Sequence, residues 1–258
     1  MAVIPEIRLG DGVKAMPAVG MGTADVPFAP ASTKPAILHA MELGYRHFDT
    51  ASLYETEQIL GEAIIEALSI GLIASRSELF ITTKLWCDQA HPDLVVSALR
   101  ESLRNLQLDY IDLYLIHMPL SSKPGTCRLL IKRDDALPLD IKSVWKAMED
   151  CQKLGLTNLI GVSNFSPHMI DKLLVTAEVP PSVNQICLRW VLEQGVSLVV
   201  KSFNKERLKE NLQIFDWELN QEERQKIDQI PQRKNFGLKS ILSTEGKLCF
   251  ELSDFEIY

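Results

Sequence analysis

Short apolar runs that alternate with segments of helical periodicity are the feature that most restricts how this chain can fold. The runs are rich in Val, Ile, Phe and Tyr and mostly lack polar–apolar alternation, which is typical of strands buried on both faces. A repeated strand-then-helix order indicates βαβ units and a parallel sheet. The expected strands are Ala18–Gly22, Arg46–Asp49, Leu79–Lys84, Ile111–His117, Leu159–Ser163, Ser182–Gln185 and Ser197–Ser202.

The segments between these runs repeat their apolar residues at helical spacing, so that each presents one apolar stripe. Pro92 suits the first turn of its helix. The expected helices cover residues 33–43, 57–69, 92–104 and 140–154, with a later one at Gln221–Ile230. Ile7–Leu9 and Val13–Met16 flank Asp11-Gly12, which predicts a hairpin before the first strand of the sheet.

The strand count predicts an incomplete barrel. A chain of 258 residues suits one large α/β barrel or two compact domains. Only seven parallel strands are found, and 11 residues separate Gln185 from Ser197. Because a βα unit of such a barrel takes about 30 residues, one or two units are expected to be missing there from a (β/α)8 barrel. The barrel is expected over residues 1–218, and a helix and tail over 219–258.

Composition excludes several classes of protein. The net charge of −7 argues against a general binder of nucleic acid or of membrane surfaces. No apolar run approaches the roughly 18 residues of a membrane helix, and no secretory signal is recognised. The five cysteines are scattered without a C-x-x-C pair, so we expect free thiols, no metal site and a cytoplasmic location.

Polar side chains stand at the carboxyl ends of successive expected strands. Asp49, Lys84 and His117 each end such a strand, and Tyr54 follows Asp49 in the next loop. The carboxyl ends of the strands in a parallel barrel open onto one face, where barrel enzymes place their active sites. We therefore expect these residues to converge although they are far apart in the sequence.

The chemistry of this group suits protonation of an oxygen that gains negative charge. Tyrosine is a weak acid with an ordinary pKa near 10, which a neighbouring ammonium such as that of Lys84 would lower. Asp49 would hold Lys84 in place, and His117 would donate a hydrogen bond to a substrate oxygen. The group contains no good nucleophile and no metal cage, so reduction of a carbonyl would need a cofactor that donates hydride.

Each residue taken alone also has a purely structural interpretation. Asp49 could cap the following helix, and Tyr54 could simply pack against its neighbours. Lys84 could form a salt bridge at the rim, and His117 could be a structural histidine. Their shared position at strand ends on one face favours the functional interpretation.

Several longer stretches resemble the aldo-keto reductases, and among them plant enzymes similar to chalcone, codeinone and galacturonate reductases. The resemblance runs from the N-terminus to about residue 185 and again from about 186 to 233. The stretches that carry it are Gly44-Tyr45-Arg46-His47-Phe48-Asp49-Thr50-Ala51, Phe80-Ile81-Thr82-Thr83-Lys84-Leu85-Trp86, Asp112-Leu113-Tyr114-Leu115-Ile116-His117, Ile160-Gly161-Val162-Ser163-Asn164-Phe165 and Leu198-Val199-Val200-Lys201-Ser202-Phe203-Asn204.

The resemblance implies an NADPH-dependent carbonyl reductase on a (β/α)8 barrel. It implies a catalytic tetrad of Asp49, Tyr54, Lys84 and His117, with Tyr54 as general acid, and a substrate cleft lined by Trp86, His117 and Met118. Trp86 could instead only pack beside the barrel, and residues 205–209 could be a solvated helix face. The implied cofactor contacts are Gly22, Thr23, Asp49, Ser163, Asn164 and Gln185, with Lys201, Ser202, Phe203, Arg207, Glu210 and Asn211 at the adenosine 2′-phosphate and adenine.

The chain departs from the family pattern after Gln185, where about sixty residues are missing. In the family this region supplies a seventh strand, whose aromatic residue stacks on the nicotinamide, and a loop that clamps the pyrophosphate. Either the sixth and eighth strands pair directly or the gap exposes core. We expect weakened NADPH binding, and the alternative is an impaired or inactive truncated reductase from splicing or a faulty gene prediction. Relatives are usually monomers, but an exposed strand edge could drive association.

Overall fold

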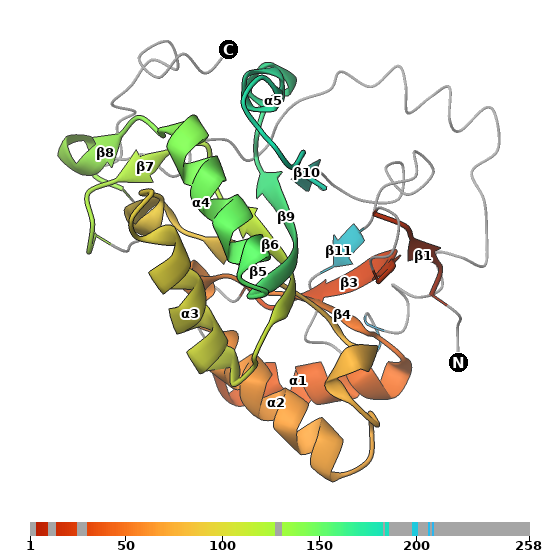
Figure 1. Cartoon of the computed structure of the whole chain (residues 1–258). Helices are drawn as coiled ribbons and strands as arrows, with labels where there is room; N and C mark the ends of the chain where they lie inside the picture. The colour runs from red at the N-terminus through yellow and green to blue at the C-terminus, as the bar shows by residue number, and fades with distance from the viewer. Residues whose placement is uncertain are drawn as a thin grey trace, which may run out of the picture.

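A computed structural model describes residues 4–9, 14–24, 30–126, 131–182, 184–185, 198–200, 206 and 208. Its centre is a parallel sheet in the order β10-β9-β6-β5-β4-β3-β11 (Figure 1). All seven predicted strands are confirmed, with small shifts at their ends. They are β3 (Val19–Gly22), β4 (His47–Asp49), β5 (Phe80–Leu85), β6 (Ile111–Ile116), β9 (Thr157–Ser163), β10 (Asn184–Gln185) and β11 (Leu198–Val200).

Helices cover the outer face of this sheet. Consecutive helices contact one another from α1 to α4, so they form a continuous layer (Figure 1). The helix α5 was not predicted, although Ser166 caps its first turn and Pro167 opens it, which is a recognisable start signal. The bounds are α1 (Pro30–Leu43), α2 (Glu57–Ser69), α3 (Val95–Leu106), α4 (Ile141–Lys153) and α5 (Pro167–Leu174).

The predicted start of α3 at Pro92 is wrong. The helix begins at Val95 and is preceded by a tight turn, in which the amides of Leu94 and Val95 both donate to the carbonyl oxygen of His91. Proline is compatible with such a turn as well as with a first helical turn, so its presence alone did not fix the boundary.

The predicted N-terminal hairpin is present as an antiparallel pair, β1 (Glu6–Ile7) with β2 (Met16–Pro17). A second short pair, β7 (Ser121–Ser122) with β8 (Ala136–Leu137), follows β6. The remaining elements are the 3-10 turns η1 (Ser52–Tyr54), η2 (Arg76–Glu78), η3 (Cys87–Gln89) and η4 (Arg133–Asp135).

Both faces of the sheet are packed, as the unbroken apolar strands predicted. In β6 the side chains of Tyr114 and Ile116 join the cluster beneath the helices. Leu113 and Leu115 join a smaller inner cluster together with Met16 of the N-terminal pair. The inner face is therefore a barrel interior whose amino end is covered by the hairpin.

Among the described residues the sheet ends at β10 and β11, which pair only with β9 and β3, respectively. Direct pairing of the sixth and eighth strands, one of the two expectations for the gap, is therefore not observed in this part of the chain. The predicted helix at Gln221–Ile230 and the tail lie outside the described residues.

Candidate active site

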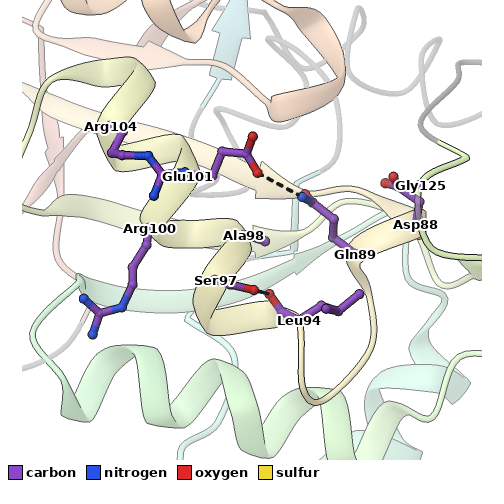
Figure 2. A pocket seen from close by; sticks show the side chains of 9 residues that line it. All are labelled: Asp88, Gln89, Leu94, Ser97, Ala98, Arg100, Glu101, Arg104 and Gly125. Carbon is purple, nitrogen blue, oxygen red and sulfur yellow. Dashed lines mark hydrogen bonds between the residues drawn. The ribbon is translucent and has the colours of Figure 1, made fainter.

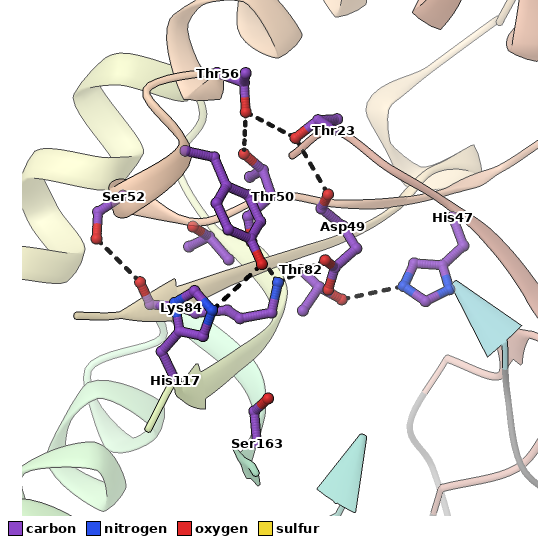
Figure 3. Close-up of polar contacts among 12 residues, drawn as sticks. Thr23, His47, Asp49, Thr50, Ser52, Thr56, Thr82, Lys84, His117 and Ser163 are labelled. Atoms are coloured by element: carbon purple, nitrogen blue, oxygen red, sulfur yellow. Dashed lines mark hydrogen bonds and ion pairs between the residues drawn. The ribbon is translucent and has the colours of Figure 1, made fainter. Parts of the chain in front are cut away.

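The predicted polar group gathers at the carboxyl edge of the sheet. Asp49 is the last residue of β4, Lys84 lies near the end of β5, and His117 follows β6 directly. Because these strands are neighbours and parallel, their ends open on the same side. Figure 3 shows the side chains of Asp49, Lys84 and His117 gathered there. Tyr54 ends η1, the short turn between β4 and α2, and its hydroxyl reaches the ring of His117. The structure thus brings all four predicted residues together.

Lys84 and Asp49 form a buried ion pair. The Lys84 Nζ donates to Asp49 Oδ1 at 2.5 Å and to the carbonyl oxygen of Thr50 at 2.9 Å. Burial by itself lowers the pKa of Lys84, but the Asp49 carboxylate and then the Tyr54 phenol raise it, and the resulting pKa lies above 10.5. Lys84 is therefore an ammonium at neutral pH.

Tyr54 lies over this ammonium. The Lys84 Nζ is 4.9 Å from the centre of the Tyr54 ring, and the Tyr54 Oη lies 3.3 Å from His117 Nε2. Burial raises the pKa of Tyr54, and Lys84 offsets this only in part, so the pKa lies above 10. Lys84 acts in the expected direction, but desolvation of the phenolate is the larger effect. Tyr54 is therefore a protonated phenol at neutral pH.

His117 is held from two sides. Its backbone amide donates to the carbonyl oxygen of Leu85 at 3.1 Å, and its own carbonyl oxygen accepts from Asn164 Nδ2 at 2.9 Å. Burial, reinforced by the Lys84 charge, moves the pKa of His117 well below 6.5. The ring is consequently a neutral imidazole, and its Nδ1 is buried without a hydrogen-bond partner.

A chain of threonine hydroxyls supports the loop that carries Tyr54 (Figure 3). The Thr56 Oγ1 lies 2.7 Å from Thr23 Oγ1 and 3.0 Å from Thr50 Oγ1. The Thr23 hydroxyl in turn donates to the carbonyl oxygen of Asp49. All three threonines are fully buried. Thr23 was expected at the cofactor, and its hydroxyl lies in this chain; Thr50 and Thr56 carried no assigned role, although both lie close to Asp49 and Tyr54 in the sequence.

Trp86 packs at the mouth of the barrel beside His117. Their ring centres are 5.0 Å apart in an edge-on arrangement, and the Trp86 side chain is 1% exposed. Trp86 and Met118 belong to one apolar cluster, which is separate from both sheet cores. This places an apolar wall next to the tetrad.

Two of the predicted cofactor residues lie at the end of β9. Ser163 is the last residue of that strand, and Asn164 follows in a left-handed conformation with φ of 63°. The Asn164 Nδ2 donates to Ser163 Oγ at 3.0 Å as well as to the His117 carbonyl oxygen. The backbone of Gln185 lies in register with Ser163. Gly22 pairs with Asp49 in the sheet. The residues expected at the adenosine end of the cofactor lie outside the described part of the chain: Lys201, Ser202, Phe203, Arg207, Glu210 and Asn211.

A separate pocket lies on the outer side of the molecule. It has a volume of about 350 Å³ and is formed by α3, η3 and the turn at Gly125 (Figure 2). Asp88, Gln89, Glu101 and Arg104 line it, and none of its lining residues belongs to the tetrad. In the described part of the chain, no group of three or more His, Cys, Asp or Glu side chains could hold a metal ion.

The chain matches the aldo/keto reductase family over residues 18–187 and 180–232. NADPH-dependent codeinone reductase 1-5 of Papaver somniferum is 46% identical over 304 aligned positions, covering 94% of each chain. D-galacturonate reductase of Fragaria ananassa is 44% identical over 94% of this chain and 96% of its own.

Two solved reductase structures are also similar to this chain in fold and sequence. A Bombyx mori aldo-keto reductase in complex with NADP has a TM-score of 0.79 and 32% identity, covering 88% of this chain and 92% of that one. The aldose reductase of Schistosoma japonicum has a TM-score of 0.82 and 28% identity, covering 88% and 93%. The described sheet and helices are therefore those of the (β/α)8 reductase barrel.

The alignments with relatives also show the gap that the sequence predicts after Gln185. Because 94% of the 258 residues is about 243, some 60 of the 304 positions aligned with the codeinone reductase have no residue of this chain opposite them. The two family matches meet at residues 180–187, which places the break beside Gln185. Because the family match covers most of its length and its fold is that of solved reductases, the chain belongs to the aldo/keto reductase family.

Proposed function

We propose that this protein reduces an aldehyde or ketone to an alcohol with NADPH, and that Tyr54 is the general acid. The observation that carries the proposal is the contact of the Tyr54 hydroxyl with His117 above the Lys84–Asp49 ion pair. A protonated phenol held over a fixed ammonium can give up its proton, because the ammonium stabilises the phenolate that remains.

His117 would orient the substrate. If the neutral ring carries its proton on Nε2, it can donate a hydrogen bond to a substrate carbonyl oxygen placed beside the Tyr54 hydroxyl. The buried Nδ1 then lacks only a donor to accept from, and no N–H group of the ring is left unpaired. Both donors would meet the oxygen on which negative charge develops. Trp86 and Met118 would provide the apolar side of the cleft.

The end of β9 fits the carboxamide of a nicotinamide. Both Nδ2 hydrogens of Asn164 are used, by His117 and Ser163, which leaves Asn164 Oδ1 as an acceptor and the Ser163 hydroxyl as a donor. A carboxamide offers the complementary pair, one NH₂ donor and one carbonyl acceptor. Gln185 lies in register with Ser163 and would complete this subsite. When bound, NADPH supplies the hydride for the carbonyl carbon.

The other end of the cofactor is assigned by family resemblance. Lys201 and Arg207 would neutralise the 2′-phosphate, for which arginine offers bidentate hydrogen bonds. Ser202, Phe203, Glu210 and Asn211 would complete the adenosine site, and Gly22, Thr23 and Asp49 would lie beside the nicotinamide. Thr23 can contribute there through its backbone, since its hydroxyl is used in the threonine chain.

The gap beside Gln185 favours a second candidate function, that of an impaired or inactive truncated reductase. Some 60 aligned positions are absent from this chain, and in the family they provide the stacking residue and the pyrophosphate clamp. We expect NADPH to bind more weakly than to an intact relative. Titration of NADPH fluorescence tests this, and submicromolar binding would contradict it.

We further propose a small-molecule carbonyl substrate and a monomer in the cytoplasm. Cys151 is a buried free thiol, which supports a reducing compartment. Among the described residues no helix is both long and apolar enough to cross a membrane. An accessible edge at β10 or β11 would instead favour association, and sedimentation analysis distinguishes the two states.

The proposal is tested by incubating the purified chain with NADPH and an aromatic aldehyde. We expect one alcohol to form for each NADPH consumed. A preparation that melts cooperatively, is stabilised by NADPH and yet consumes none would support the inactive alternative. A chain that NADPH does not stabilise would contradict both the cofactor and the reaction.

A further inference from the structure

Hydrogen bonds outside the tetrad join two loops at the mouth of the barrel. The first loop follows β5 and carries Trp86, and the second follows β6 and carries Met118 and β7. The Ser121 hydroxyl, on β7, donates to the carbonyl oxygen of Ala90 at 3.1 Å and lies 3.4 Å from that of Cys87. Ser121 is 2% exposed, so water does not compete for these contacts.

His91 makes the same connection in the opposite direction. Its Nε2 lies 2.7 Å from the carbonyl oxygen of Ser122 and 3.2 Å from the Ser121 hydroxyl. Because a carbonyl oxygen only accepts, the proton lies on Nε2, and the Ser121 hydroxyl can accept from the same N–H while it donates to Ala90. The side chains of Ser121 and His91, which we call the staple, therefore hold β7 against the turn at residues 86–91.

The apolar cluster beside the tetrad is built from both of these loops. Trp86 and Cys87 come from the first loop, and Met118, Leu120 and Ile131 come from the second. The Trp86 ring lies edge-on to that of His117, with 5.0 Å between the ring centres. The cluster thus forms a wall beside the proposed donor to the substrate oxygen, and the two parts of this wall keep their relative position only while the loops are joined.

The tetrad is fixed by other contacts. His117 is held through its own backbone by Leu85 and Asn164. Neither these two bonds nor that between Lys84 and Asp49 involves the staple. Loss of the staple should therefore move the wall and leave the proton donors in place.

We infer that Ser121 is a positioning residue for the apolar wall, and that its staple with His91 gives the enzyme a preference for carbonyl substrates that carry an apolar ring. This inference rests on the proposed function, which places the substrate between Tyr54 and this wall. Ser121 touches neither substrate nor cofactor. It acts on Trp86 through the turn that follows it, so it changes how tightly the ring of the substrate is held and not how fast the proton is transferred.

Steady-state kinetics of the full chain with benzaldehyde and with glyceraldehyde, at saturating NADPH, test the inference. Ser121→Ala keeps the side chain small but withdraws the donor from the Ala90 carbonyl oxygen. We expect the KM for benzaldehyde to rise about fivefold, the equivalent of one net hydrogen bond, with kcat unchanged. Glyceraldehyde has no ring to place on the wall, so its KM and kcat should stay unchanged, as should the affinity for NADPH.

Ser122→Ala is the matched control, because Ser122 is the other buried serine of β7. Its hydroxyl accepts from the Thr126 hydroxyl, and the substitution keeps the carbonyl oxygen to which His91 donates. This variant should leave both KM values unchanged.

His91→Leu removes the other half of the staple and does not alter β7. It should raise the KM for benzaldehyde in the same way, and combining it with Ser121→Ala should raise that KM little further. The inference is overturned if Ser121→Ala leaves the KM for benzaldehyde unchanged, raises both KM values equally, or has the same effect as Ser122→Ala.

The wild type separates failure of this inference from failure of the proposed function. If it reduces both aldehydes but its KM for benzaldehyde is not the lower of the two, the preference is absent and only the inference is overturned. If a folded wild type reduces neither aldehyde, the proposed reaction fails and the inference fails with it.

Discussion

The Lys84 ammonium lies 2.5 Å from the Asp49 carboxylate, and both side chains are almost completely removed from solvent. This pair places a fixed positive charge beneath the Tyr54 ring. Each member compensates the charge of the other, so the pair should behave as one unit in folding as well as in chemistry.

Breaking the pair should destabilise the protein more than removing it altogether. Asp49→Asn leaves the Lys84 ammonium buried without its counter-charge, at a cost of about 3–5 kcal/mol. In Asp49→Asn/Lys84→Met no charge is buried, so we expect a destabilisation clearly smaller than the sum of the two single variants. Urea unfolding of the wild type and the three variants measures this. Strictly additive effects would show that the two charges do not interact.

Stability should fall between pH 6.5 and pH 4 because of His47. Burial lowers the pKa of His47 to about 4, although Asp49 opposes this shift. The unfolded chain protonates His47 below about pH 6.5, whereas the folded chain does so only below about pH 4. The contribution of neutral His47 to the free energy of unfolding is therefore complete at higher pH and is lost as the pH falls. For this residue alone the loss between pH 7 and pH 5 is about 2 kcal/mol.

Urea unfolding at the two pH values checks this expectation. His47→Gln removes the titrating ring and should flatten the dependence, whereas His117 still titrates in both proteins with the same sign. If the free energy of unfolding changes equally with pH in the wild type and in His47→Gln, His47 is not the source of the pH dependence.

A side chain at Gly20 should destabilise the protein, because Gly20 faces the His47 ring. A Cβ at Gly20 would lie 2.5 Å from His47 Nδ1, and the ring is further confined by Phe80 and Thr82. We expect Gly20→Ala to cost about 1–3 kcal/mol through overpacking. In a His47→Ala background the same substitution should cost much less. Thermal unfolding of the wild type, the two single variants and the double variant tests this. If Gly20→Ala destabilises both backgrounds equally, the clash with the His47 ring is not the cause.

The threonine chain should affect catalysis by holding the Tyr54 loop. Thr56→Val keeps the size of the side chain but removes the hydroxyl that contacts Thr23 and Thr50. We expect kcat to fall several-fold, with a loss of roughly 1 kcal/mol in stability for each hydrogen bond removed. Thr56→Ser retains the hydroxyl and should restore kcat. If the serine variant is as slow as the valine variant, packing of the methyl group and not the hydroxyl is responsible.

The parallel sheet and the convergence of the tetrad were predictable because both follow from local patterns. Buried strands are unbroken apolar runs, and their carboxyl ends necessarily meet at one edge of a parallel sheet. Asp49, Lys84 and His117 stand at such ends, so their proximity could be inferred without any knowledge of side-chain contacts.

Other features depend on contacts that the sequence does not display. Whether Lys84 or burial decides the pKa of Tyr54 depends on a balance of desolvation and charge that only the packed structure shows. A hydrogen bond from the Tyr45 hydroxyl to the carbonyl oxygen of Leu208 joins positions 163 residues apart. The start of α3 was misplaced because proline at position 92 is as compatible with a turn as with a helix.

The central claim, that Tyr54 is the proton donor, is tested most directly by comparing NADPH consumption with an aromatic aldehyde in the wild type and in Tyr54→Phe. The account predicts a fall in kcat of at least about a hundredfold, the usual contribution of a general acid, with NADPH affinity and melting temperature unchanged. A Tyr54→Phe enzyme that retains most of the wild-type rate would contradict it.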